Sequence, residues 1–217
     1  MKADEVVHYL QNNPQFFEEH AEVLTSMVVP HPHGGRTISI TERQMLALRD
    51  KNRLLEGRMG ELFQHGEEND AISEKMHRLA LGLIATGSFQ SVLHTLHFHL
   101  RDDFAVPHVA VRLWCRPADA AELPEFADVS SELQAFAEAL VQPYCGATGG
   151  FETSSWFGEA ATHVRSQALI AMRQGGGTTG MIALGSEDHE RFYPTMGTIY
   201  LQRIGEMASA ALARVLR

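Results

Sequence analysis

Short apolar runs and one alternating segment predict a β-sheet in the second half of the chain. Residues 167–173 and 181–185 are apolar runs that are bracketed by turn residues and too short for helices. The glycine-rich residues 174–180 join them, which predicts an antiparallel hairpin with a flexible loop. Residues 109–114 alternate strictly and predict another strand. Its two faces would carry Val109, Val111 and Leu113 on one side and Ala110, Arg112 and Trp114 on the other.

A stripe of apolar residues predicts that a long helix over residues 41–85 joins two copies of the chain. Thr41 and Gln44 can form a capping box at its start. Beyond this cap runs a seam with the heptad spacing of a coiled coil. The seam residues are Met45, Leu48, Asn52, Leu55, Met59 and Leu62. Asn52 takes an a position, where a buried amide selects a parallel two-stranded register, so we expect a parallel homodimer.

The seam loses its phase in the middle of this helix. Gly66 and Asn69 occupy the next seam positions. The apolar stripe then resumes one residue out of phase, at Ile72, Met76, Leu79 and Leu83. A phase slip beside a glycine predicts a kink or a helix break where the long helix meets the next domain. Because the seam is short, an amphipathic helix that packs on its own domain stays open as the alternative.

Turn residues and helical spacing divide the chain into three parts. Residues 1–40 would hold short helices and a connector rich in proline and glycine. Residues 41–85 form the long, dimerising helix, and residues 86–217 form an α+β domain. The expected helices of that domain cover residues 89–100, 131–141 and 194–217.

Several ordered motifs resemble the bacterial DUF484 family. They are YLQNNPQFF at 9–17, PHPHGG at 30–35, SITERQ at 39–44, LRDKN at 48–52 and the segment 185–192. The strand, serine, acidic loop, phenylalanine and helix that end the chain are similar to the last third of GAF domains. The resemblance implies a GAF-like domain, with a central antiparallel sheet flanked by helices, behind a helical N-terminal segment. It implies no established activity, and the frequent position of family genes beside a tyrosine recombinase is a contextual hint only.

Aromatic residues and one arginine gather in the segments that would cover the sheet. In GAF domains that bind small molecules, loops and short helices similar to residues 146–158 cover the pocket. Aromatic walls with a few polar groups suit such pockets. The candidate pocket residues are Arg112, Trp114, Tyr144, Phe151, Trp156 and Phe157. Core packing is the alternative explanation of these residues, and the sequence identifies neither a ligand nor a cofactor.

The chain lacks the residue patterns of common catalytic and metal centres. No GxSxG, HExxH, P-loop or paired cysteine motif occurs, so we predict no catalytic residue and no metal site. His31 with His33 and His94 with His97 are pairs without a third ligand at a suitable spacing. The glycines of residues 175–180 match GxGxxG, but a strand follows where the dinucleotide fingerprint requires a helix.

Charge and cysteine content narrow the partners and the compartment. A net charge of −9 argues against nucleic acid and anionic membranes as partners. Cys115 and Cys145 form no CxxC motif and suit a reducing cytoplasm. No apolar run approaches the roughly 20 residues that span a bilayer, so we expect a soluble cytoplasmic protein. Covalent attachment of a bilin-type cofactor would need a pocket cysteine, and Cys145 is the plausible position.

These patterns favour a non-enzymatic regulatory or sensor module. In the leading hypothesis, a homodimer binds a small molecule in its GAF-like domain, and the ligand shifts the balance between conformations. In the first alternative, the protein is an interaction scaffold without a ligand, linked to a tyrosine recombinase or another DNA-associated protein partner. A metal-dependent enzyme that uses the histidines is a third, weaker hypothesis.

Overall fold

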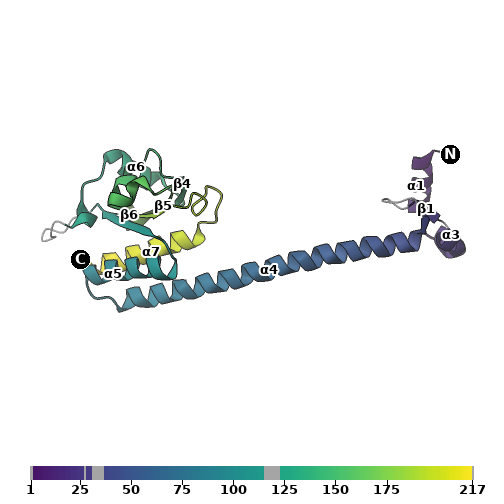
Figure 1. Ribbon diagram of the computed structural model, residues 1–217, viewed down its shortest axis with the longest axis horizontal. Helices are drawn as coiled ribbons and strands as arrows, with labels where there is room; N and C mark the ends of the chain where they lie inside the picture. Colours follow the sequence, from purple (N-terminus) through teal and green to yellow (C-terminus); the bar gives the residue numbers. More distant parts are fainter. Residues whose placement is uncertain (1, 27, 31–36, 115–122, 217) are drawn as a thin grey trace. The chain divides into compact units, whose positions relative to one another are not determined.

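The computed structural model (Figure 1) describes residues 2–26, 28–30, 37–114 and 123–216. Side chains are described for all of these except 24–26, 28–30, 37–39, 41 and 42. The chain divides into two compact units, Met1–Glu68 and Asn69–Arg217, and the helix α4 (Ile40–Ala85) contributes to both. The three-part division at residues 40 and 85 stays a prediction. Outside the described residues lie His31, His33, Cys115 and the capping side chain of Thr41.

The first unit begins with short helices and a two-stranded sheet. Its helices are α1 (Ala3–Asn12), α2 (Phe16–Glu19) and α3 (Ala21–Ser26). Strands β1 (Val28–Pro30) and β2 (Thr37–Ser39) pair antiparallel. The ring of Phe16 meets those of Tyr9 and Phe17 edge-on, at centroid distances of 6.4 and 5.5 Å. This unit therefore places a small aromatic cluster between α1 and α2.

The helix α4 continues without interruption, so the helix break predicted near Gly66 and Asn69 is wrong. Either residue costs at most about 1 kcal/mol relative to alanine in a helix, and the helical hydrogen bonds on both sides outweigh this cost. The apolar seam residues are 46–69% exposed in the described chain, and Asn52 is exposed as well. In this single chain, the seam residues are therefore not buried as the side chains of a coiled-coil seam would be.

The second unit is built on a four-stranded antiparallel sheet, which confirms the predicted α+β class. The strand order is β3-β6-β5-β4. The strands are β3 (His108–Leu113), β4 (Tyr144–Ala147), β5 (Ser166–Gln174) and β6 (Gly177–Ser186). The alternation predicted for β3 is confirmed, because Val109, Val111 and Leu113 join one apolar cluster while Ala110 and Trp114 join the other.

The central hairpin is tighter than the sequence suggested. Strands β5 and β6 are connected by Gly175 and Gly176 alone, and both have positive φ, 61° and 92°. The predicted seven-residue loop is wrong, since residues 177–180 pair with β5. Gly180 belongs in the strand for a steric reason. A Cβ there would lie 2.4 Å from the carbonyl oxygen of Arg112, so glycine permits the close approach of β3.

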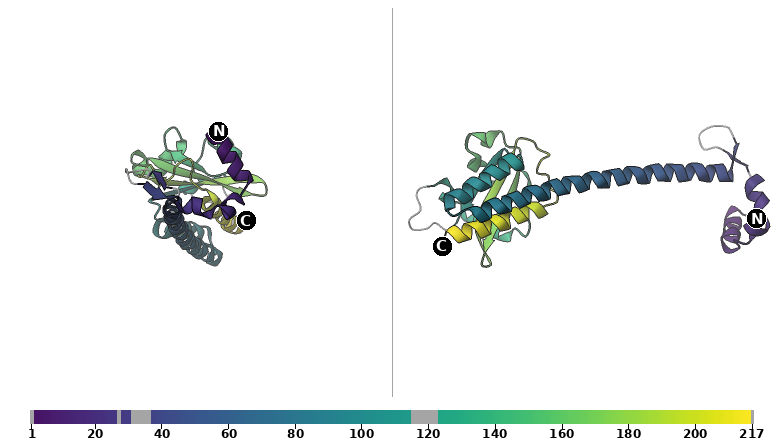
Figure 2. Two further views of the ribbon diagram at one scale, coloured as in Figure 1. Left: turned by 90° about the vertical axis from the view of Figure 1, so that its right-hand side faces the viewer. Right: turned by 90° about the horizontal axis from the view of Figure 1, so that it is seen from below.

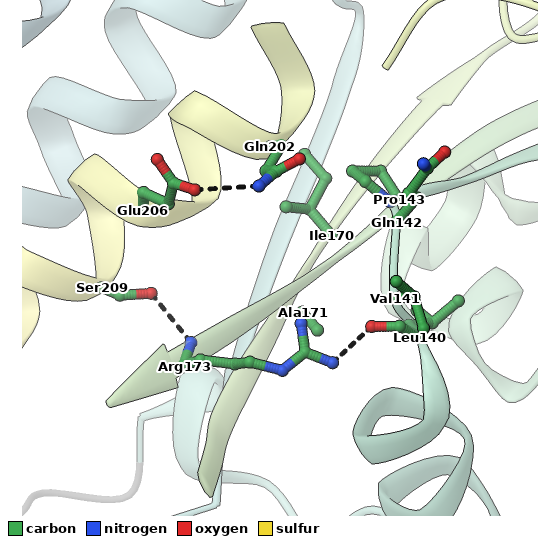
Figure 3. Close-up of a pocket in the computed structure, with 10 residues that line it drawn as sticks. All are labelled: Leu140, Val141, Gln142, Pro143, Ile170, Ala171, Arg173, Gln202, Glu206 and Ser209. Carbon is green, nitrogen blue, oxygen red and sulfur yellow. Dashed lines mark hydrogen bonds between the residues drawn. The ribbon is translucent and has the colours of Figure 1, made fainter. Parts of the chain in front are cut away.

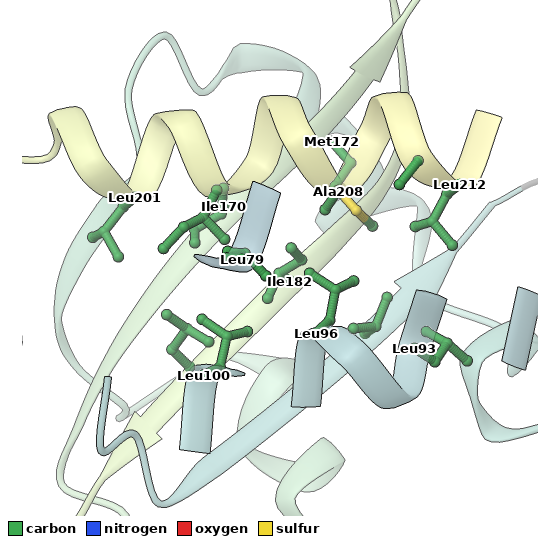
Figure 4. Close-up of a cluster of buried hydrophobic side chains, with 14 of the residues drawn as sticks. Leu79, Leu93, Leu96, Leu100, Ile170, Met172, Ile182, Leu201, Ala208 and Leu212 are labelled. Carbon is green, nitrogen blue, oxygen red and sulfur yellow. The ribbon is translucent and has the colours of Figure 1, made fainter. Parts of the chain in front are cut away.

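One face of the sheet is covered by four helical segments (Figures 1 and 2). They are the C-terminal part of α4, α5 (Phe89–Phe98), the π-helix η1 (His99–Asp103) and α7 (Ile199–Val215). The last helix begins at Ile199, five residues later than predicted from Pro194. Figure 4 shows the core between these helices and the sheet, which includes Leu79 of α4 and Ile182 of β6, both fully buried. The resumed stripe on α4 is therefore the contact of α4 with its own sheet.

The opposite face of the sheet carries a smaller layer. It consists of α6 (Ser131–Ala139) and the 3-10 segment η3 (Glu152–Thr162). The short 3-10 turn η2 (Pro124–Phe126) precedes α6 and buries Phe126. Leu133 and Ala137 of α6 pack against Leu169 and Ala183 of the sheet. The sheet thus separates two apolar clusters, one large and one small.

Within the second unit, polar contacts attach the C-terminal end of α4 to η1 and α7. The Asp103 carboxylate of η1 accepts hydrogen bonds from Arg78 at 2.8 Å and from His99 at 2.6 Å. These bonds hold the pKa of Asp103 below its usual range. The Arg214 guanidinium of α7 donates to the carbonyls of Leu83, Ile84 and Thr86 at 2.7–3.1 Å. Arg214 therefore caps the C-terminus of α4, where carbonyls lack helical partners.

Candidate functional site

The structure brings the six candidate pocket residues to one face of the sheet, the face covered by α6 and η3. Trp114 directly follows β3, and Tyr144 lies in β4. Phe151 directly precedes η3, and Trp156 and Phe157 lie within it. All five rings are half-buried against the smaller apolar cluster. Arg112 points to the same side, since it lies two residues from Trp114 along the strand.

Arg112 places a cation beside an aromatic ring on this face. Its Cζ lies 5.0 Å from the centroid of the Trp156 ring, within the range of a cation–π contact. Its Nη1 donates a hydrogen bond to the carbonyl of Val111 at 3.0 Å. Burial lowers the pKa of Arg112 from its ordinary value, with Glu125 and Glu152 acting in the opposite direction. A guanidinium stays charged in proteins, so this face keeps a partly desolvated positive charge.

A buried amide on the same face was not among the candidate residues selected from the sequence. Gln167 of β5 is fully buried, and its Oε1 accepts a 2.8 Å hydrogen bond from Thr153 of η3, also fully buried. Its Nε2 has no hydrogen-bond partner among the described residues. An unpaired buried donor costs about 1–3 kcal/mol, so it favours any ligand or water that supplies an acceptor. Only the pairing of strand and covering segment reveals this group.

The aromatic side chains on this face pack against each other. The ring centroids of Tyr144 and Phe151 are 4.9 Å apart, and those of Phe136 and Phe151 are 5.4 Å apart. The main cavities among the described residues are lined by other side chains. A ligand on this face would therefore have to displace part of the α6 and η3 layer. Gly158, with φ of 59°, interrupts η3 and marks a place where this layer bends.

A cavity of about 180 Å³ lies between α7 and the segment that follows α6. Figure 3 shows the residues that line it. Arg173 bridges its two sides. Its backbone N–H donates to Ser209 Oγ of α7 at 3.1 Å, and its guanidinium donates to the carbonyls of Ala137 and Leu140. These bonds occupy the guanidinium with the last carbonyls of α6, so the cavity is a structural junction.

The described histidines and Cys145 are not grouped as the ligands of one metal ion. His94 is exposed and His97 is half-buried, and burial lowers the pKa of His97. Among the described residues, no three histidine, cysteine, aspartate or glutamate side chains are placed to hold one metal ion. Cys145 is a free, buried thiol whose pKa is raised by burial to about 11. Such a thiol stays protonated at neutral pH, which disfavours cofactor attachment there.

A four-stranded antiparallel sheet between two helical layers defines the class of the second unit as α+β. Two solved GAF domains are similar in structure to part of this chain. The A. aeolicus nlh2 GAF domain, solved in an inactive state, has a TM-score of 0.48 and 14% identity and covers 67% of this chain and 97% of that chain. The GAF domain of a Pseudomonas syringae pv. tomato protein, described as a sensor histidine kinase, has a TM-score of 0.45 and 13% identity, with coverage of 70% and 91%.

The sequence matches the family described as "Protein of unknown function, DUF484" over residues 1–216, and the chain belongs to this family. The protein YigA of Salmonella typhimurium strain LT2 is 29% identical over 218 residues, which cover 98% of this chain and 91% of that protein. YigA of Shigella flexneri is 34% identical over 97 residues, which cover 45% and 41%. Both relatives are described as uncharacterized. In the described part of the chain, no helix has the length and apolarity to cross a bilayer.

Proposed function

We propose that this protein is a non-enzymatic regulatory module, a homodimer joined along α4 whose second unit binds a small molecule. The exposed seam of α4 is the observation that carries the proposal. Five apolar side chains at heptad spacing, 46–69% exposed, would meet a second copy in a coiled coil. The ligand would act by favouring one of two arrangements of the dimer, since a ligand shifts an equilibrium only through a difference in affinity.

The dimer is tested at Asn52, whose amide interrupts the apolar seam. In a parallel coiled coil, Asn52→Leu buries more apolar surface and removes the group that selects the register. Burial of a leucine side chain is worth about 1.5–3 kcal/mol, so the dimer dissociation constant should fall about tenfold or more. Sedimentation equilibrium should also show species larger than dimers, because the stoichiometry becomes less restricted.

Gln64→Leu is the matched control, since Gln64 lies on the same helix at heptad position f, outside the seam. In the structure, its side chain donates a hydrogen bond to Glu68 at the surface. This variant should leave the dissociation constant near that of the unmodified protein. Equal effects of the two substitutions, or a monomeric protein at all concentrations, would refute the seam.

The ligand part of the proposal rests on the α6 and η3 face. It combines aromatic walls, the half-buried charge of Arg112 and the unpaired amide of Gln167. Native mass spectrometry of protein purified from cells should detect a stoichiometric small-molecule adduct. Trp114→Ala and Trp156→Ala should each lose this adduct, whereas Phe98→Ala, an exposed ring on α5, should keep it. An adduct retained in both tryptophan variants would place the ligand elsewhere.

A specific observation favours a second candidate function, an interaction scaffold without a ligand. The aromatic side chains on the α6 and η3 face fill the space between sheet and cover by their own contacts. In this case the dimeric helices would present a surface to a protein partner. A bare dimer in native mass spectrometry, with the seam result intact, would support this candidate over the first.

A further inference from the structure

A mainly apolar cavity on the other face of the sheet has the dimensions of a ligand site. It measures about 420 Å³ and lies where the C-terminal part of α4, η1 and α7 meet. Ligand cavities commonly measure 300–1,000 Å³ and are lined mainly by apolar side chains. The lining here includes Ile72 of α4, Phe104 after η1, Leu184 of β6, and Tyr200 and Ile204 of α7. We call it the α4–α7 cavity.

Two cations stand at the wall of this cavity, and both lie beside the same residue. The Nζ of Lys75 is 5.9 Å from the centroid of the Phe104 ring. The Nη2 of Arg191 donates a 2.6 Å hydrogen bond to the Phe104 carbonyl. Apart from Lys75, Arg191 and Gly197, the described lining residues carry aliphatic or aromatic side chains, with the Tyr200 hydroxyl as a further polar group. The cavity therefore combines an apolar interior with a local cluster of positive charge.

Among the described residues, neither cation takes part in an ion pair. In the parts of the chain that the structure describes, no carboxylate lies within 4 Å of Lys75 or Arg191. The Nε of Arg191 is shielded from solvent and has no hydrogen-bond partner there. A guanidinium offers five N–H donors, so the Phe104 carbonyl leaves most of them free. In a chain with a net charge of −9, two unpaired cations beside an apolar cavity are complementary to an anion.

We propose that the α4–α7 cavity binds an amphipathic carboxylate, a small organic acid with one anionic head and an apolar chain. The chain would occupy the apolar interior, and the head would accept hydrogen bonds from Lys75 and Arg191. Charge-assisted hydrogen bonds to a carboxylate are about twice as strong as neutral ones. A cationic or purely polar ligand lacks this match, since it would meet two like charges or leave the apolar lining uncovered.

This site is separate from the proposed ligand site on the α6 and η3 face. Leu184 and Ile204 belong to the apolar cluster on the opposite side of the sheet. The inference therefore goes beyond the proposed function and stands or falls independently of it. Ile72 and Lys75 lie on α4, the helix that carries the seam, so the bound acid would contact α4 directly.

Isothermal titration calorimetry of the full chain with decanoate tests this site. Decanoate has an apolar chain and one carboxylate, and it should bind with saturation at one site per chain. 1-Decanol has the same chain without the charge and should bind at least tenfold more weakly. Decyltrimethylammonium has the opposite charge and acetate has no chain, so neither should bind measurably. Equal binding of decanoate and 1-decanol would overturn the proposal.

Variants locate the binding. Lys75→Gln and Arg191→Gln should each raise the dissociation constant for decanoate about tenfold, the equivalent of one charge-assisted hydrogen bond. Arg165→Gln removes an exposed charge of the same unit outside the cavity and should bind as the unmodified protein does. Ile72→Trp fills part of the cavity and should weaken binding without a change in charge. Unchanged circular dichroism spectra would show that each variant folds.

Three results would count against the assignment. Decanoate binding that is equal in Lys75→Gln, Arg191→Gln and the unmodified protein would place the acid elsewhere. Binding lost only in Trp156→Ala would assign it to the α6 and η3 face. Attachment to phosphatidylglycerol vesicles that excess decanoate does not displace would assign the cations to a membrane surface.

Discussion

Arg214→Ala should loosen the end of α4 and lower the stability of the second unit. The guanidinium donates hydrogen bonds to the carbonyls of Leu83, Ile84 and Thr86 at 3.0, 3.1 and 2.7 Å. The carbonyls of Leu83 and Ile84 lie in the last turn of α4 and that of Thr86 lies just beyond it, and the Leu83 carbonyl also accepts hydrogen bonds from the N–H and the hydroxyl of Thr86. A hydrogen bond from a charged donor contributes about 1.5–3 kcal/mol when shielded, but Arg214 is exposed, so solvent weakens each bond. We therefore expect a total loss of about 1–2 kcal/mol.

Thermal unfolding followed by circular dichroism measures this loss at a fixed protein concentration. For a chain of this size, 1 kcal/mol corresponds to about 2–4 °C, so the midpoint should fall by roughly 3–6 °C. Arg214→Lys keeps the charge but loses the fork of donors and should recover only part of the difference. Arg203→Ala, an exposed arginine on the same helix, is the control and should change the midpoint little. An Arg214→Ala midpoint within 1 °C of the unmodified protein would refute the cap.

Three further predictions concern Asp103, Gly205 and Cys145. The hydrogen bonds that Asp103 accepts lower its pKa in the folded protein. They therefore stabilise the fold fully at pH values above the unfolded-state pKa of about 4. This stabilisation is lost as the pH falls through the lower pKa of the folded state. Denaturant unfolding at pH 7, 5 and 3 should therefore show a smaller acid loss in Asp103→Asn, and equal losses would contradict the linkage. Gly205→Ala should lower the free energy of unfolding by about 1–3 kcal/mol in the same denaturant assay, because the new Cβ would lie 2.6 Å from Ile170 Cγ2. An unchanged denaturation midpoint would refute this close packing of α7 on β5. The buried Cys145 thiol has a pKa of about 11, so little thiolate is present at pH 8. In a Cys115→Ser variant, Cys145 should therefore react slowly with a disulfide reagent at pH 8 in the folded protein and quickly after unfolding. A fast reaction of the folded protein would contradict the burial of Cys145.

Short apolar runs bracketed by turn residues, together with one alternating segment, predicted three strands of the four-stranded sheet. The residues of β3 fall on the two faces that their alternation predicted. The short edge strand β4 escaped prediction, because Tyr144–Ala147 contains only four residues and includes a glycine. Residues 177–180 looked like a loop by composition, yet they pair with β5. Their strand geometry follows from the close approach of β3 at Gly180, a tertiary contact that local composition does not encode.

The apolar pattern predicted the ends of the long helix α4 more accurately than its continuity. Both apolar stripes, over residues 45–62 and 72–83, lie on α4 as predicted, and the role of the first as a dimer seam stays a prediction. The break that the intervening Gly66 and Asn69 suggested does not occur. Helix propensity is a weak guide at single residues, since each costs only a fraction of what a long helix gains. The stripe at 72–83 packs on the sheet, and the stripe at 45–62 is exposed.

The candidate sites differed in how much the sequence could reveal. Trp114 was selected from the alternation of its strand, and the aromatic residues of the segment 146–158 were selected from the resemblance to GAF domains. Gln167 carried no sequence signal, because its significance comes from burial beneath η3. Lys75 and Arg191 are far apart in the sequence and meet only around Phe104. A cavity whose walls come from several elements requires the folded chain.

The π-helical turn η1 has a consequence for related sequences. Its five residues, His99–Asp103, occupy a wider turn than an α-helix would give the same stretch, and Leu100 and Phe104 reach the cavity wall from it. A relative with one residue fewer here could complete an ordinary α-helix and keep the sheet. Its side chains beyond the deletion would then be rotated about the helix axis, and Phe104 would no longer stand between Lys75 and Arg191. The length of this segment is therefore a practical criterion for deciding which members of the family share the arrangement around Phe104 on which the proposed acid site depends.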